Sequence, residues 1–123
     1  MSTPITLNVA ALNIDCVDST ALADFWAKTL GRPVSPGKVA GDTAVDTTTP
    51  ETGPRMLFHN VPNPKPGNRF HLVLITDHYT EEIARVTALG ANPLSETTLP
   101  DVRWTTLADP EGNEFDLVTW HAA

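Results

Sequence analysis

The chain has 123 residues, of which 41% are hydrophobic and 11 are proline, and its formal net charge is -7 at pH 7. This length can bury one core, so we expect a single domain over residues 1–123. The acidic balance argues against nucleic acid or an anionic membrane as a partner, because phosphates attract clustered Lys and Arg. The sequence has no apolar run near the ~20 residues that cross a bilayer and no secretory signal pattern, so we expect a cytoplasmic protein.

The first predicted element is a strand over Ile5–Cys16. Its apolar residues change parity along the strand, and the odd positions become polar at Asn13 and Asp15. This pattern predicts a sheet that packs on helices and turns Asn13 and Asp15 towards a cavity. The single cysteine, Cys16, excludes an internal disulfide, and its apolar parity favours buried packing over a catalytic thiol.

A helix is predicted over Ser19–Leu30, with Asp18 as its N-cap and Gly31 as its C-terminal stop. Shorter strands and a proline-rich connection follow. The sequence predicts two short strands within Pro33–Thr49, a strand over Arg55–Val61, and a loop over Pro62–Asn68 that separates two halves.

The most strand-like run of the chain is Arg69–Ile75, in which a strand is predicted over His71–Ile75. Alternation places His71 on one face of this strand together with Val73 and Ile75. An imidazole within a sheet needs a hydrogen bond, a metal ion or a ligand. The strand alone leaves these three alternatives open.

The second half repeats the order of the first. A second helix is predicted with Thr80 as its N-cap and Gly90 as its stop, and the spacing from Asp77 to Gly90 equals that from Asp18 to Gly31. Each half therefore reads as strand, helix and three strands, with repeat one at about 5–61 and repeat two at about 69–120. The last strands are predicted over Leu94–Glu96, Val102–Leu107 and Glu114–Trp120, with a hairpin turn over Asp109–Asn113.

Several short segments of the sequence are similar to those of a known family, and the similarity covers almost the whole chain. These segments are a Leu-Gly pair after each helix, Ala21–Trp26, Val61–Lys65, Arg69–Leu72 and Asp109–Phe115. With them, the chain resembles the vicinal oxygen chelate superfamily, and within it the glyoxalase-like, bleomycin-resistance-like branch. The resemblance implies an α+β fold in which two βαβββ repeats form a cupped eight-stranded mixed sheet with the helices outside. It also implies a small-molecule ligand on the concave face and a homodimer.

The resemblance further implies a divalent metal in the enzymes of the superfamily, bound by residues of the first, fourth, fifth and eighth strands. Carried over, these positions fall on Ala11, near Leu57, on His71 and on Asp116, so half of the usual ligand set is absent. His59 shares the face of Leu57 by alternation. His59, His71 and Asp116 would supply two imidazoles and a carboxylate, the donor set of a facial triad for a transition metal.

A site without metal is the alternative. Asp116 would then accept a ring proton of His71, and the pair would act as acid and base or as hydrogen-bonding anchors, with His59 assisting. The cofactor is thus either none or one divalent transition metal. Further predicted substrate-binding residues are Asn13, Asp15, Trp104 and Trp120.

Two functions follow from these residues. The first is a small glyoxalase-like enzyme, a lyase, isomerase or cyclase for an oxygen-bearing organic molecule, but not a glutathione-dependent glyoxalase, because the ligand set is incomplete. The second is a non-catalytic protein of the bleomycin-resistance kind that binds a drug or metabolite. Recovery of the bound compound, changed or unchanged, would distinguish them.

Overall fold

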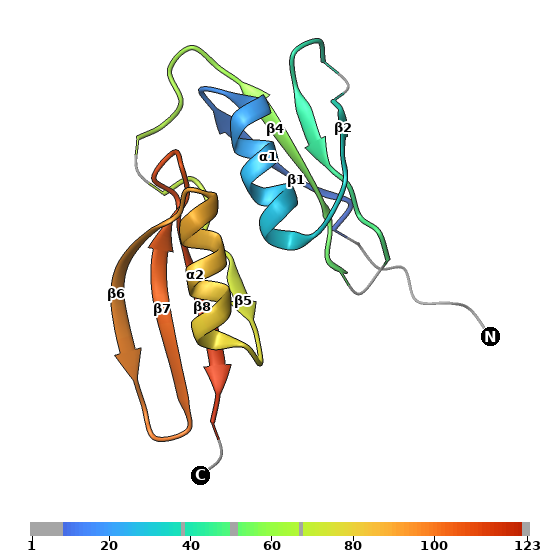
Figure 1. Cartoon of the computed structure of the whole chain (residues 1–123). Helices are drawn as coiled ribbons and strands as arrows, with labels where there is room; N and C mark the ends of the chain where they lie inside the picture. The colour runs from blue at the N-terminus through green and yellow to red at the C-terminus, as the bar shows by residue number, and fades with distance from the viewer. Residues whose placement is uncertain (1–8, 38, 50–51, 67, 122–123) are drawn as a thin grey trace, which may run out of the picture.

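The computed structural model describes residues 9–37, 39–49, 52–66 and 68–121. It contains two successive units that each run strand, helix and three strands (Figure 1). The elements of the first unit are β1 (Ala11–Cys16), α1 (Ser19–Leu30), β2 (Val34–Pro36), β3 (Thr43–Val45) and β4 (Arg55–Asn60). Those of the second are β5 (Val73–Ile75), α2 (Tyr79–Leu89), β6 (Asn92–Thr98), β7 (Val102–Ala108) and β8 (Glu114–Trp120).

Each unit forms a four-stranded mixed sheet of the same topology. The strand orders are β1-β4-β3-β2 and β5-β8-β7-β6, and in each sheet the first and last strands of the unit pair in parallel. Each helix lies in front of its own sheet in Figure 1, which leaves the opposite face of both sheets uncovered by helix. The predicted α+β fold with two βαβββ repeats is confirmed.

The first helix follows its predicted signals. The Asp18 side chain accepts a hydrogen bond from the backbone N–H of Ala21, and Gly31 ends α1 in the left-handed conformation, with φ of 65°. The face of α1 that packs on the sheet buries Leu22 and Trp26 completely. The two caps and the buried apolar face therefore define the same helix, Ser19–Leu30.

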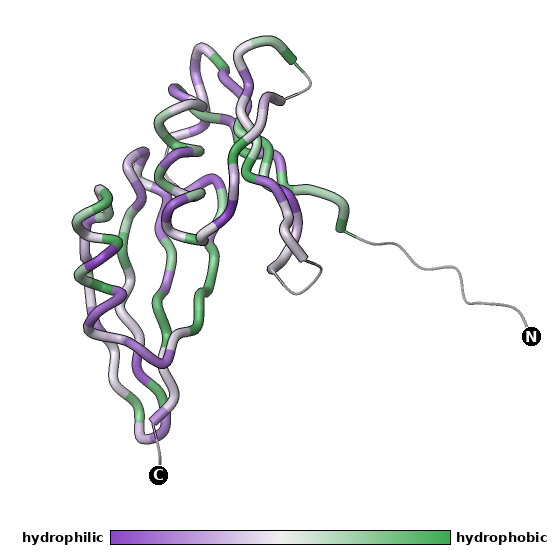
Figure 2. The backbone as a smooth tube through the Cα atoms, turned by 45° about the vertical axis from the view of Figure 1, so that its right-hand side comes forward, coloured by the Kyte–Doolittle hydropathy of each residue, from purple (hydrophilic) through white to green (hydrophobic). Residues whose placement is uncertain are grey.

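The predicted N-cap of the second helix is wrong. α2 begins at Tyr79, and His78, at the N-cap position, makes no side-chain capping bond. Tyr79 is held by tertiary contacts instead, since its hydroxyl lies 2.5 Å from Oγ1 of Thr105 and the Arg103 guanidinium lies 4.3 Å from its ring centroid. These contacts override the local signal of Thr80. Purple and green bands alternate along α2 in Figure 2, as expected for a helix with one polar and one apolar side.

Three predicted strands differ from the observed ones by more than one residue at a boundary. β1 begins at Ala11, and residues 5–8 of the predicted strand lie outside the described residues. β5 is shorter than predicted, so His71 precedes the strand and does not lie within it. β6 is longer, over Asn92–Thr98, and contains an irregularity between Pro93 and Ser95. A proline is tolerated there because β6 is an edge strand.

Aromatic side chains of both units share one buried core. The ring of Trp26 on α1 lies 4.9 Å from that of Phe115 on β8 and 5.6 Å from that of Phe70. Arg85 of α2 donates hydrogen bonds of 2.9 Å to the carbonyls of Lys28 and Thr29 at the end of α1. Within the described part of the chain, no helix is long and apolar enough to cross a membrane.

Candidate functional site

The second sheet has one face packed against α2 and one face left open. Phe115 and Leu117 of β8 point towards the helix side and are buried. On the opposite side, Val73, Ile75 and Trp120 are 66%, 68% and 63% exposed. We call this side the open face and define it by residues of β5, β7 and β8: Val73, Ile75, Trp104, Thr106, Asp116, Val118 and Trp120.

Strand register places these side chains in two rows. Val73 pairs with Asp116, which pairs with Thr106. The next row along the strands joins Ile75, Val118 and Trp104 in the same way. Because paired residues point to the same side of a sheet, a polar row lies beside a row of large apolar side chains.

The polar row holds a chain of hydrogen bonds. Nε2 of His71 lies 3.0 Å from Oδ2 of Asp116, and the Thr106 hydroxyl donates to the other carboxylate oxygen at 2.6 Å. The Asp116 backbone N–H is itself bonded to the Leu72 carbonyl at 2.9 Å. With Nε2 donating to the carboxylate, Nδ1 of neutral His71 is an acceptor, and no described residue bonds to it.

His59 lies on the other sheet and has another carboxylate as its partner. Its Nδ1 lies 2.6 Å from Oδ2 of Asp42, whose second oxygen accepts the Asn60 backbone N–H at 3.2 Å. Hydrogen bonding to Asp42 and the charge of that carboxylate raise the pKa of His59, with a smaller contribution from the charge of Asp15. The same hydrogen bond lowers the pKa of Asp42. His59 and His71 therefore belong to two separate pairs.

The donors that a metal site would need do not converge. Among the described residues, no three His, Cys, Asp or Glu side chains lie so as to hold one ion. Ala11 of β1 and Leu57 of β4, at the other two family positions, have no ligand atoms. Both oxygens of Asp116 already accept hydrogen bonds. The residues present thus do not fit the predicted three-residue centre.

Asn13 and Asp15 of β1 line a cavity of about 410 Å³ at the connection between the two units. Ile14 of β1 also lines it, and Lys65, Asn68 and Arg69 of that connection form its other wall. We call this space the linker cavity. Trp104 and Trp120, also predicted to bind substrate, lie on the open face and not in this lining.

Sequence reasoning missed Lys65, Asn68 and Arg69, because they lie within or just after a proline-rich segment that has the pattern of a simple connection. A usable signal was present in the charges, since two basic residues stand close together in a strongly acidic chain. The predicted packing role of Cys16 is in keeping with its full burial. Burial, followed by the charge of Glu111, raises the pKa of its thiol to about 12.

Comparison with known proteins assigns the family. The model of the glyoxalase-like domain matches residues 11–118, and the chain belongs to that family. This confirms the predicted resemblance to the glyoxalase-like branch of the vicinal oxygen chelate superfamily. No protein of curated function matches the sequence.

Solved structures share the fold at low sequence identity. A glyoxalase/bleomycin resistance protein/dioxygenase family enzyme from Burkholderia phytofirmans PsJN has a TM-score of 0.74 and 17% identity, over 92% of this chain and 98% of that chain. TnmS3, an antibiotic binding protein from Streptomyces sp. CB03234, has a TM-score of 0.71 and 21% identity, over 97% and 100%. A glyoxalase/bleomycin resistance protein/dioxygenase from Nocardioides has a TM-score of 0.68 and 18% identity, over 96% and 86%.

Proposed function

We propose that this protein binds a small organic molecule on the open face of the second sheet. The molecule would combine an apolar, preferably flat, body with an oxygen-bearing group. The observation that carries this proposal is the position of the His71–Asp116–Thr106 hydrogen-bond chain directly beside the apolar row of Ile75, which is exposed, and Val118 and Trp104, which are half-buried. Apolar walls with a few fixed polar groups are the usual composition of a small-molecule site.

Each part of the open face has a role in this binding. Trp104 and Ile75 would contact the apolar body, and burial of their exposed area would supply most of the favourable free energy. The free acceptor Nδ1 of His71 would bond to a hydroxyl or another donor of the ligand. Asp116 fixes the orientation of the ring, so the geometry of that bond is set before the ligand arrives.

Proton transfer by His71 is the second candidate, favoured by the bond between Nε2 and Asp116. A carboxylate on one ring nitrogen stabilises the imidazolium that forms when the other nitrogen takes a proton. His71 would then remove a proton beside a carbonyl group, and lyase, isomerase or cyclase chemistry begins with that step. His59 would not take part directly, because it is bonded to Asp42.

The similarity to an antibiotic binding protein supports the binding form of this proposal, in which a drug or metabolite is held without turnover. The fold alone does not select between binding and catalysis, since one fold hosts many chemistries. The two forms differ in a simple observable. A bound compound is returned unchanged in one case and altered in the other.

The binding proposal is tested with a library of aromatic and carbonyl-bearing fragments, followed by ligand-observed NMR. Ile75→Asp places a charge in the apolar row, and Val39→Asp is its matched control, because Val39 is 56% exposed and lies outside the open face. We expect hits of the native protein to be lost in Ile75→Asp and kept in Val39→Asp. Equal binding by both variants would exclude the open face as the site.

The same hits separate binding from catalysis. Each carbonyl compound is incubated with the protein in D2O and recovered. Deuterium at the carbon beside the carbonyl, absent with His71→Asn, indicates proton transfer. Recovery without deuterium or chemical change leaves binding alone.

A further inference from the structure

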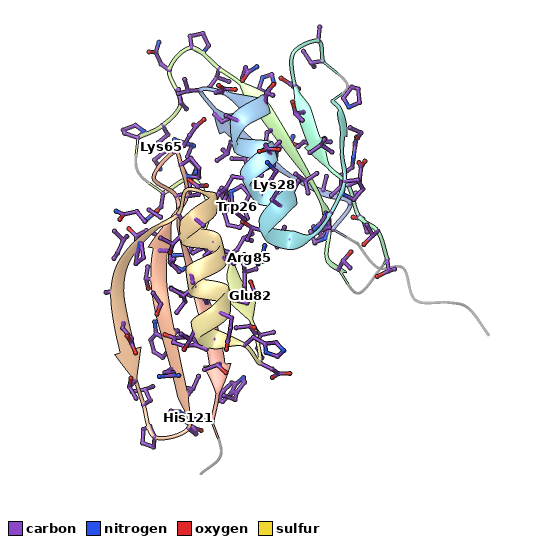
Figure 3. The ribbon with its side chains drawn as sticks, in the orientation of Figure 1. Trp26, Lys28, Lys65, Glu82, Arg85 and His121 are labelled. Atoms are coloured by element: carbon purple, nitrogen blue, oxygen red, sulfur yellow. The ribbon has the colours of Figure 1, made fainter. Side chains whose placement is uncertain are left out.

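The linker cavity is lined by two exposed charged groups, Lys65 and Asp15, that have no ion-pair partner among the described residues. Of the basic side chains in the described residues, Lys28, Arg55, Arg69 and Arg85 each pair with a carboxylate, Arg32 bonds to backbone carbonyls and Arg103 covers an aromatic ring. The ammonium group of Lys65 has none of these partners among the described residues. Figure 3 shows Lys65 on the connection between the two units, apart from Lys28 on α1.

A carboxylate without a bonded partner stands on the other wall. Asp15 of β1 lines the linker cavity with Asn13, and neither side chain makes a hydrogen bond to another described residue. No ion pair joins Asp15 to Lys65 in the described structure. A positive and a negative group therefore face the same space of about 410 Å³ without satisfying each other.

The wall that carries Lys65 is held in place by hydrogen bonds of Arg69 and Asn68. The side chain of Arg69 is 9% exposed; it donates to the Lys65 carbonyl at 3.1 Å and to Oε1 of Glu111 at 3.0 Å. Its Nε is buried and has no hydrogen-bond partner. Asn68 is fixed by two bonds to Glu114, at 2.7 and 3.2 Å. Lys65 is thus presented by a segment held against the second unit.

The linker cavity is close in the chain to the proposed site. Arg69 precedes His71 by two residues, and Glu114, which holds Asn68, precedes Asp116 on β8 by two residues. A ligand with its apolar body on the open face could therefore extend a polar end towards Lys65 and Asp15. This step rests on the proposed function.

We propose that the linker cavity recognises a zwitterionic end of the ligand, of the amino-acid type. Lys65 binds its carboxylate, and Asp15, with Asn13, binds its ammonium group. Each contact is a charge-assisted hydrogen bond, which is stronger than a neutral one. A ligand that lacks either group leaves one charge of the cavity without a partner.

The test uses three compounds with one ring system. They are 3-(2-naphthyl)alanine, its amide, which lacks the carboxylate, and 3-(2-naphthyl)propanoate, which lacks the ammonium group. Dissociation constants are measured by calorimetry at neutral pH. We expect naphthylalanine to bind about tenfold more tightly than either of the others, the effect of one charge-assisted bond.

Two variants separate the contacts. In Lys65→Met the advantage of naphthylalanine over its amide should vanish, and in Asp15→Asn its advantage over naphthylpropanoate should vanish. Lys28→Met and Asp24→Asn are matched controls, because these residues form an exposed ion pair on α1 and change the net charge equally. Both controls should keep both advantages.

The outcomes distinguish this inference from the proposed function. Equal binding of all three compounds, an advantage that survives in Lys65→Met and Asp15→Asn, or no binding of naphthylalanine overturns the zwitterion site. If the three compounds bind equally and all are lost in Ile75→Asp, the open face stands and the linker cavity fails. If the advantages are present and Ile75→Asp keeps them at undiminished affinity, the linker cavity stands and the open face fails.

Discussion

The indole Nε1 of Trp26 donates a hydrogen bond of 2.9 Å to Oδ2 of Asp109, and so joins the helix of the first unit to the β7–β8 turn of the second. Both residues are buried. The other oxygen, Oδ1, accepts the backbone N–H groups of Glu111 and Asn113, each at 2.9 Å. One carboxylate therefore shapes the turn and holds the two units together.

Asp109→Ala should destabilise the fold by about 3 kcal/mol, because it leaves the buried indole N–H and the turn N–H groups without acceptors. The measurement is unfolding by denaturant. Asp101→Ala is the control, since Asp101 is exposed and its side chain makes no hydrogen bond to a described residue. A loss for Asp109→Ala no larger than that of the control would contradict the joining role.

Arg32 is the second structural group that we expect to be sensitive. Its guanidinium donates to four backbone carbonyls, those of Val45, Asp46, Thr52 and Pro54, and the residue is 7% exposed. Arg32→Met should lower the free energy of unfolding by about 2 kcal/mol, because these buried carbonyls lose their donors. Arg55→Met removes a partly exposed ion pair and should cost no more than roughly 1 kcal/mol. Equal losses in the two variants would refute this assignment.

The His59–Asp42 pair should make stability depend on pH. Because folding raises the pKa of His59, this residue contributes to the free energy of unfolding. The contribution is complete at pH values below the ordinary His pKa of 6.5 and is lost as the pH rises through the raised pKa. A lowered pKa of Asp42 gives a contribution that is present above its ordinary value of 3.8 and is lost as pH falls through the lowered pKa. The pair therefore stabilises most between these two pH values.

NMR titration of the His59 ring checks this prediction. Asp42→Asn should lower the pKa of His59, because the amide cannot stabilise the imidazolium as a carboxylate does. Asp116→Asn, a change on the other sheet, should leave it unaltered. An unchanged His59 pKa in Asp42→Asn would show that the pair does not form in solution.

Metal binding is predicted to be weak, because the three candidate donors do not converge. Purification with and without chelator should leave the thermal unfolding midpoint within about 2 °C, as expected when no ion is linked to folding. The contrary result is one tightly bound transition metal per chain whose affinity falls in each of the single variants His59→Ala, His71→Ala and Asp116→Ala. That result would restore the facial triad.

Local sequence signals predicted the fold correctly where the conformation depends only on residues that are near in the chain. Asp18 and Gly31 act as predicted because capping and left-handed φ depend on neighbours along the chain. Thr80 failed because the start of α2 is set by contacts of Tyr79 with β7. The late start of β5, at Val73, likewise depends on its pairing with β8, which no local pattern contains.

Individual residues of the candidate site could be predicted from the sequence, but not all of the contacts between them. The family resemblance predicted His71 and Asp116 as partners, and the structure joins them. Alternation placed His59 correctly beside Leu57 on one face of β4, but it contained no information on Asp42, which lies across the sheet and binds the imidazole. The linker cavity depends on the folding of the connection against β1, so its basic residues were not found.

The most direct test of the open face is the map of backbone amide NMR shifts when the tightest-binding fragment is added. The largest shifts should occur at Thr106, Asp116 and Val118. A neighbouring cavity, of about 360 Å³, shares Val73 and Ile75 with the open face and has Glu82 and Arg85 of α2 in its wall (Figure 3). Shifts confined to Glu82, Arg85 and their helix would contradict the proposed site.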